Sequence, residues 1–176
     1  MSAEFAVLAA LAIPLLGALL IVAAHRAPNV REAVTLGTAS LLFVTVLSLL
    51  PGVLGGARPA LRVVELLPDI PLAFEVEPLG MLFALVASGL WIVNSVYSIG
   101  YMRGNDEAHQ TRFYACFALA LAATIAVAFA ANVLTLFLAY ELLTLVTYPL
   151  VTHHGTPEAM RAGRVYLGVL LGTSIP

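Results

Sequence analysis

Residues 113–152 read FYACFALALAATIAVAFAANVLTLFLAYELLTLVTYPLVT and contain a single charged side chain, that of Glu141. A helix needs about 20 mostly apolar residues to cross a bilayer. The stretch therefore predicts two membrane spans, residues 113–131 and 133–152, which meet at Asn132. Because the turn between them is so short, the two spans must be antiparallel neighbours.

The rest of the chain has the same character. Of its 176 residues, 61% are hydrophobic and only 10% are charged, which is more apolar surface than a water-soluble domain of this size can bury. Three further spans are predicted at residues 5–24, 33–50 and 79–100, and a sixth helix, starting near residue 163, is too short to cross. We predict one all-α transmembrane domain over residues 1–176, with five full spans and a truncated sixth, in contact with a lipid bilayer.

The one long connection, residues 51–78, has the alternation of a β-hairpin. Residues 61–66 and 72–77 each partly alternate apolar with polar side chains, and the PDIP sequence at 68–71 between them is typical of a turn. We predict a short hairpin between the second and third helices that lies against helix ends or a neighbouring subunit, because an isolated hairpin is marginal in water. An irregular loop without strand pairing is the alternative.

The arginines indicate the orientation, since cytoplasmic loops of membrane proteins carry an excess of positive charge. With the N-terminus outside, the outer loops hold Arg58 and Arg62. The inner loops then hold Arg26, Arg31, Arg103, Arg112, Arg161 and Arg164. This distribution predicts an outer N-terminus and places the hairpin on the outer surface.

Composition excludes several classes of function. A net charge of −2 argues against a nucleic-acid partner, and the lone Cys116 cannot form a disulfide framework or a multi-cysteine metal site within the chain. A haem anchor would need histidines inside the spans, but all four lie in inner loops or at helix ends: His25, His109, His153 and His154. We expect no cofactor, metal or redox centre in this chain.

Glu141 is the one ionisable residue predicted to lie well inside a span, and such residues are rare and usually functional. Thr144 and Tyr148 follow at i+3 and i+7 on the same helix face, so their hydroxyls could hold a water or hydrogen-bond the carboxyl group. We predict that Glu141, Thr144 and Tyr148 transfer protons, with His153 and His154 at the inner mouth. The alternatives are a protonated Glu141 that only hydrogen-bonds a neighbouring helix, and solvated loop histidines.

Three motifs carry a resemblance to a known family. They are YSIGYM at residues 97–102, RFY at 112–114 and NVLTLFLAYEL at 132–142. Together they resemble the N-terminal part of the antiporter-like proton-channel family. Its members include the antiporter-like membrane-arm subunits of respiratory complex I, the D and A subunits of multisubunit cation/proton antiporters, and membrane subunits of energy-converting hydrogenases. Residues 147–155 resemble the antiporter D type most.

The resemblance implies a proton-translocating subunit of an energy-coupling membrane, such as the bacterial cytoplasmic membrane, that works with other membrane subunits. The family pairs the glutamate at the position of Glu141 with a lysine on a later helix, but this chain contains no lysine. We therefore expect another segment or chain to supply the lysine-bearing helix. The sequence leaves open whether the chain is a fragment, a split subunit or a degenerate copy. The alternative function is a structural or assembly subunit that does not transport.

Overall fold

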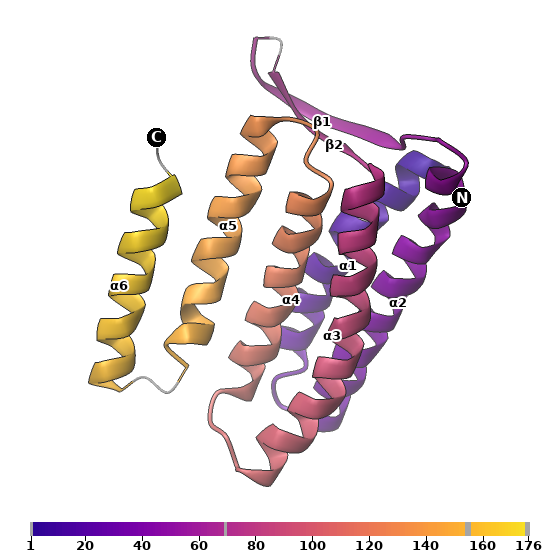
Figure 1. The fold of residues 1–176 in the computed structure, drawn as a ribbon. Helices are drawn as coiled ribbons and strands as arrows, with labels where there is room; N and C mark the ends of the chain where they lie inside the picture. Colours follow the sequence, from indigo (N-terminus) through magenta and orange to yellow (C-terminus); the bar gives the residue numbers. More distant parts are fainter. Residues whose placement is uncertain (1, 69, 154–155, 175–176) are drawn as a thin grey trace.

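The computed structural model describes residues 2–68, 70–153 and 156–174. Within these residues it contains six helices and one two-stranded antiparallel sheet (Figure 1). The helices are α1 (Ala3–Ala23), α2 (Pro28–Leu54), α3 (Pro78–Gly104), α4 (Gln110–Ala128), α5 (Val133–Val151) and α6 (Pro157–Ser174), and the strands are β1 (Ala60–Leu67) and β2 (Ile70–Glu75).

The helices run alternately up and down, as short connections require. Helices α1 to α4 pack together, α5 packs against α4, and α6 packs against α5 at one edge of the molecule (Figure 1). Helices α1 to α5 are each long and apolar enough to cross a membrane. The predicted all-α bundle of five spans with a hairpin between the second and third helices is therefore confirmed.

The helices reach further than the sequence analysis placed them. Helix α2 starts at Pro28 and ends at Leu54, and α3 continues to Gly104. The expected bounds stopped at charged residues, whereas Arg31, Glu32 and Arg103 lie within these helices. Pro28 occupies the first turn of α2, where its missing N–H is not needed.

Helix α6 also differs from the prediction. It begins at Pro157, six residues before the expected start, so Arg161 and Arg164 belong to the helix and not to a loop. Thr156 explains the earlier start, because its hydroxyl accepts a hydrogen bond from the backbone N–H of Ala159 at 3.2 Å and so caps the first turn. Its three charged residues set α6 apart from the five candidate spans.

Two glycines allow close helix packing inside the bundle. A Cβ atom at Gly17 of α1 would overlap the side chain of Thr38 in α2, and one at Gly80 of α3 would overlap the backbone carbonyl oxygen of Ala128 in α4. Small residues at such crossings let membrane helices approach closely.

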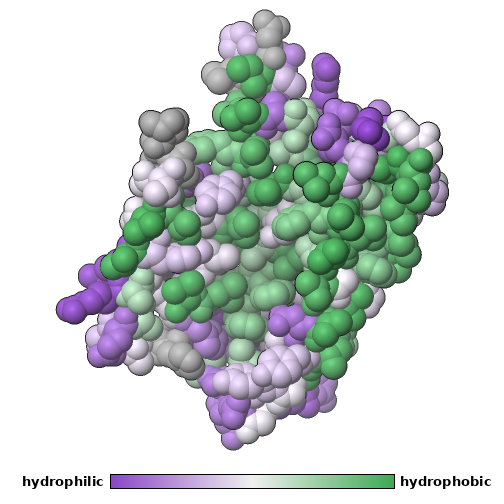
Figure 2. All heavy atoms as spheres, in the orientation of Figure 1, coloured by the Kyte–Doolittle hydropathy of each residue, from purple (hydrophilic) through white to green (hydrophobic). Residues whose placement is uncertain are grey.

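Hydrophobic residues cover most of the middle of the visible face, and hydrophilic residues gather at its two ends (Figure 2). Exposed apolar side chains on the candidate spans include Leu19, Leu41, Leu90 and Val93. Each is more than half exposed, which suits contact with lipid.

The hairpin lies across the turn between α4 and α5. The backbone N–H of Glu75 donates to the carbonyl of Phe129 at 2.7 Å, and that of Ala131 donates to the carbonyl of Ala73 at 3.0 Å. Phe74 and Val76 are buried beneath it. The hairpin is thus held by helix ends, as the sequence predicted.

Candidate functional site

Glu141 lies near the middle of α5, eight residues after Val133 and ten before Val151. Asn132 fixes the start of this helix, because its side-chain oxygen accepts a hydrogen bond from the N–H of Thr135 at 2.8 Å. The Asn132 amide also donates to the carbonyl of Pro71 in β2 at 2.7 Å. One side chain therefore both caps the helix that carries Glu141 and ties it to the hairpin.

The Glu141 side chain is half-buried, and its Oε1 atom is shielded from solvent without a hydrogen-bond partner among the described residues. The ion pairs within the described part of the chain do not include Glu141. Burying a carboxylate oxygen without a partner is costly. A polar or charged group from beyond the described residues would satisfy this oxygen.

The two hydroxyl residues predicted beside Glu141 have different surroundings. Thr144 is buried, whereas Tyr148 is half-buried and faces α6, where a Cβ atom at Gly163 would come within 2.9 Å of its ring. In the described part of the structure, no hydrogen bond joins Glu141 to either hydroxyl. The helix places the three residues on one face, as predicted, but does not connect them directly.

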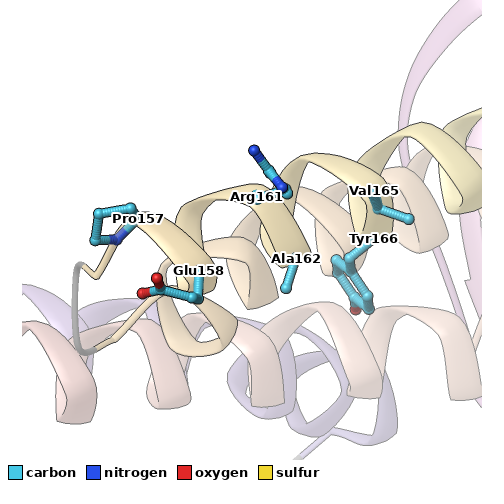
Figure 3. Close-up of a pocket in the computed structure, with 6 residues that line it drawn as sticks. All are labelled: Pro157, Glu158, Arg161, Ala162, Val165 and Tyr166. Carbon is cyan, nitrogen blue, oxygen red and sulfur yellow. The ribbon is translucent and has the colours of Figure 1, made fainter.

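The sequence analysis missed a second hydroxyl pair, which involves Thr147, a residue between Thr144 and Tyr148 in the chain. The Thr147 Oγ1 and Tyr166 OH atoms are 2.9 Å apart and link α5 to α6. Figure 3 shows Tyr166 pointing away from α6 toward the neighbouring helices, while Arg161 points outward. Helical spacing puts Thr147 off the face of Glu141, so only the packing of α6 could reveal the pair.

An open hollow of about 680 Å³ lies along α6 on the side of this contact (Figure 3). It is lined by Pro157, Glu158, Arg161, Ala162, Val165 and Tyr166. Two charged side chains, Glu158 and Arg161, thus line the same hollow as Tyr166.

His153 follows the end of α5. It lies at the end of the molecule opposite the hairpin. This end carries Arg26, Arg31, Arg103 and Arg112 and is called the arginine-rich end below. Its backbone carbonyl accepts a hydrogen bond from Arg112 Nη2 at 2.8 Å, and its ring meets Phe113 edge-on with a centroid distance of 5.8 Å. His154 lies outside the described residues. Across the part of the chain that the structure describes, no group of three His, Cys, Asp or Glu residues could hold a metal ion.

A cluster of charged side chains lies at the same end, in residues that the sequence analysis placed outside the predicted spans. Glu32, 6% exposed, accepts hydrogen bonds from Arg103 Nε at 2.9 Å and from Arg103 Nη2 at 2.6 Å. Arg31, 5% exposed, lies 3.7 Å from Glu32 and 5.4 Å above the Tyr114 ring. Pro28 just before these residues was the available signal that a helix had already begun.

Residues 67–114, from the end of β1 through α3 into α4, match the family model described as the N-terminus of chain 5 of NADH-ubiquinone oxidoreductase (complex I). The resemblance to the antiporter-like family is confirmed. The match includes the YSIGYM and RFY motifs, while Glu141 lies beyond it. The match covers about a quarter of the chain, and together with the five candidate spans it indicates an integral membrane protein that is similar to this family.

The fold also has a neighbour of known structure. It is similar to a chain of the membrane-bound sulfane sulfur reductase (MBS), an archaeal respiratory membrane complex, with a TM-score of 0.66 and 19% identity. The alignment covers 81% of this chain and 22% of the other, so the present chain spans about a fifth of its neighbour's length. No curated protein sequence matches this chain.

Proposed function

We propose that this chain is a proton-translocating subunit of a multisubunit membrane complex of the complex I, cation/proton antiporter or energy-converting hydrogenase type. Glu141 would be the carboxylate that gains and loses the proton. The observation that carries the proposal is the buried Oε1 atom, without a hydrogen-bond partner in the described residues, in the middle of a span of an antiporter-like protein. Intramembrane acids of this kind commonly mark ion pathways.

The cationic partner would come from a lysine-bearing helix of another segment or chain. Helix α5 supports this, because only Thr135, Ala139 and Thr144 of its 19 residues are buried. Leu138, Leu142 and Leu145 leave apolar surface on which a further helix could pack. An approaching ammonium group would stabilise ionised Glu141, and its withdrawal would favour the protonated form.

Hydroxyl groups would extend the proton path from Glu141 toward the arginine-rich end. Thr144 and Tyr148 lie on the Glu141 face, and Thr147 of the Thr147–Tyr166 pair lies at the same level of the helix, between them in the chain. Bridging waters between these groups would connect them. His153 and His154 would pass protons at the mouth of the path.

The test is Glu141→Gln in the assembled complex, with proton transport measured in sealed vesicles. We expect at least a tenfold loss of transport with normal assembly. Glu158→Gln, which neutralises an exposed carboxylate at the start of α6, is the matched control and should transport normally. Unchanged transport in Glu141→Gln would exclude the proposed role.

A non-transporting structural subunit is the second candidate, and the absence of lysine from the chain favours it. A scaffold would be required for assembly of the complex, yet its Glu141→Gln variant would retain full transport. Co-purification of the other subunits, measured beside the vesicle assay, therefore separates the two functions.

An outer N-terminus is part of the proposal. The structure gathers Arg26, Arg31, Arg103 and Arg112 at the end opposite the hairpin, and this end would face the cytoplasm. A single cysteine placed at Ser2, in a Cys116→Ala background, should react with a membrane-impermeant thiol reagent added from outside. Labelling that requires opening the cells would reverse the orientation.

A further inference from the structure

An open hollow of about 590 Å³ lies at the arginine-rich end, where the connection between α1 and α2 meets the start of α4. Its basic lining side chains are His25, Arg31, His109 and Arg112, and Glu107 is its acid. Its lining does not include the residues proposed to carry protons, although Arg112 of the lining also donates a hydrogen bond to the backbone carbonyl of His153 at 2.8 Å.

The buried Arg31 gives this hollow a positive charge that is only partly compensated. Its Nη1 and Nη2 atoms donate to Thr111 Oγ1 at 3.1 Å and to Gln110 Oε1 at 2.7 Å, both neutral acceptors. Its Nε atom is buried without a hydrogen-bond partner in the described structure. Glu32 is 3.7 Å away, but both of its oxygens already accept from Arg103. Two guanidinium groups thus share one carboxylate.

Two helices begin beside the hollow without side-chain caps. The N-cap residues of α2 and α4, Ala27 and His109, make no capping hydrogen bond, whereas Ser2 and Asn132 cap α1 and α5. The first backbone N–H groups of a helix attract anions, phosphate in particular. They add to the charge of Arg31 at this position.

We propose that this hollow binds a phosphate group, and that the group belongs to the headgroup of an anionic lipid. Among the lining residues, Arg31 and Arg112 are opposed by Glu107, which leaves one positive charge in the hollow and matches a phosphodiester monoanion. Basic pockets between membrane helices at the cytoplasmic side suit such headgroups.

The probe is phosphatidylglycerol, with phosphatidylcholine as the neutral comparison. The full chain is purified in detergent with both lipids, and native mass spectrometry counts the lipid molecules that stay bound. The wild-type protein should retain one phosphatidylglycerol in preference to phosphatidylcholine. Arg31→Gln should weaken this retention about tenfold, because it removes charged hydrogen bonds to the phosphate. Arg58→Gln, at the hairpin end, should not change it.

A second variant covers the case in which Arg31→Gln fails to fold. Arg112 is exposed at the rim, so Arg112→Gln keeps the buried cluster and should still weaken retention several-fold. Inorganic phosphate is tested separately as a stabiliser in phosphatidylcholine bilayers. A rise in unfolding temperature there, without phosphatidylglycerol selectivity, would overturn the lipid assignment. Retention that is equal in the wild type and in the folded variants would overturn the site altogether.

Discussion

Two glutamates in the helices, the buried Glu32 and the half-buried Glu141, differ in their surroundings. Glu32 accepts two hydrogen bonds from Arg103 and lies 3.7 Å from Arg31, so its charge ties α2 to α3. Glu141 has one oxygen shielded from solvent and no hydrogen-bond partner for it in the described residues. The first arrangement holds two helices together, whereas the second leaves a carboxylate oxygen open to a partner from beyond the described residues.

The contacts around the two glutamates differ in strength as well. Charge-assisted pairs hold the arginine-rich end, but caps and neutral hydroxyl contacts hold α5 and α6. Neutral hydrogen bonds between membrane helices contribute only about 0.6 kcal/mol on average. We therefore expect substitution of Glu32 to lower stability, and substitution of Glu141 to lower transport with little effect on stability.

Glu32→Gln should cause the largest loss of stability. It leaves Arg31, which is buried, without its carboxylate, and leaving a buried charge without its partner costs about 3–5 kcal/mol. We expect a loss of about 3 kcal/mol in the free energy of unfolding, measured by denaturant titration in micelles. A loss below about 1 kcal/mol would show that Glu32 is as weakly coupled as Glu141.

Asn132→Ala should have an intermediate effect. The substitution removes both the cap on α5 and the hydrogen bond to Pro71, and the loss of an N-cap costs about 1 kcal/mol. We expect a loss of 1–2 kcal/mol in the same titration. Ser2→Ala is the matched control, because its 3.3 Å cap at α1 is exposed and has no link to the hairpin. Equal losses in the two variants would contradict a role of Asn132 in holding the hairpin.

Tyr166→Phe should have a small effect on stability. It removes the hydroxyl that meets Thr147 and should cost about 0.6 kcal/mol. A double-mutant cycle with Thr147→Val measures the coupling directly, and a coupling near zero would mean that the pair does not hold α6. A loss of transport in Tyr166→Phe larger than its loss of stability would instead support its place on the proton path.

Glu141→Gln should change stability least. The amide keeps the shape of the side chain and leaves no ion pair broken in the described structure, so the free energy of unfolding should change by less than about 0.5 kcal/mol. The same titration measures it. A loss comparable to that of Glu32→Gln would show that Glu141 already has a strong partner within this chain.

The sequence predicted the five spans and the hairpin because both depend on local patterns of apolar residues and turn residues. It placed the ends of α2 and α3 wrongly because charge was taken to mark the membrane surface. Arg31, Glu32 and Arg103 compensate one another across two helices, and such pairing depends on tertiary packing. The proline at the start of α2 was a local signal that could have corrected this boundary.

The sequence predicted the candidate site about as far as it predicted the fold. Glu141 was identifiable because a charge inside an apolar span is rare, and helical spacing placed Thr144 and Tyr148 on its face. The Thr147–Tyr166 pair depends on how α6 crosses α5, which periodicity does not encode. The link from Asn132 to the hairpin joins residues that are 61 positions apart and follows only from the assembled fold.

Strand β2 is hydrogen-bonded to the turn between α4 and α5, and these bonds hold the first end of α5 in place. Glu141 lies nine residues from Asn132, or about 13 Å along the axis at 1.5 Å per residue, and the far end of the helix lies about twice as far away. If α5 tilts during a working cycle, the swing at Glu141 is half of that at Val151. The hairpin would then hold one end of α5 in place while the other end, near the arginines, moves most.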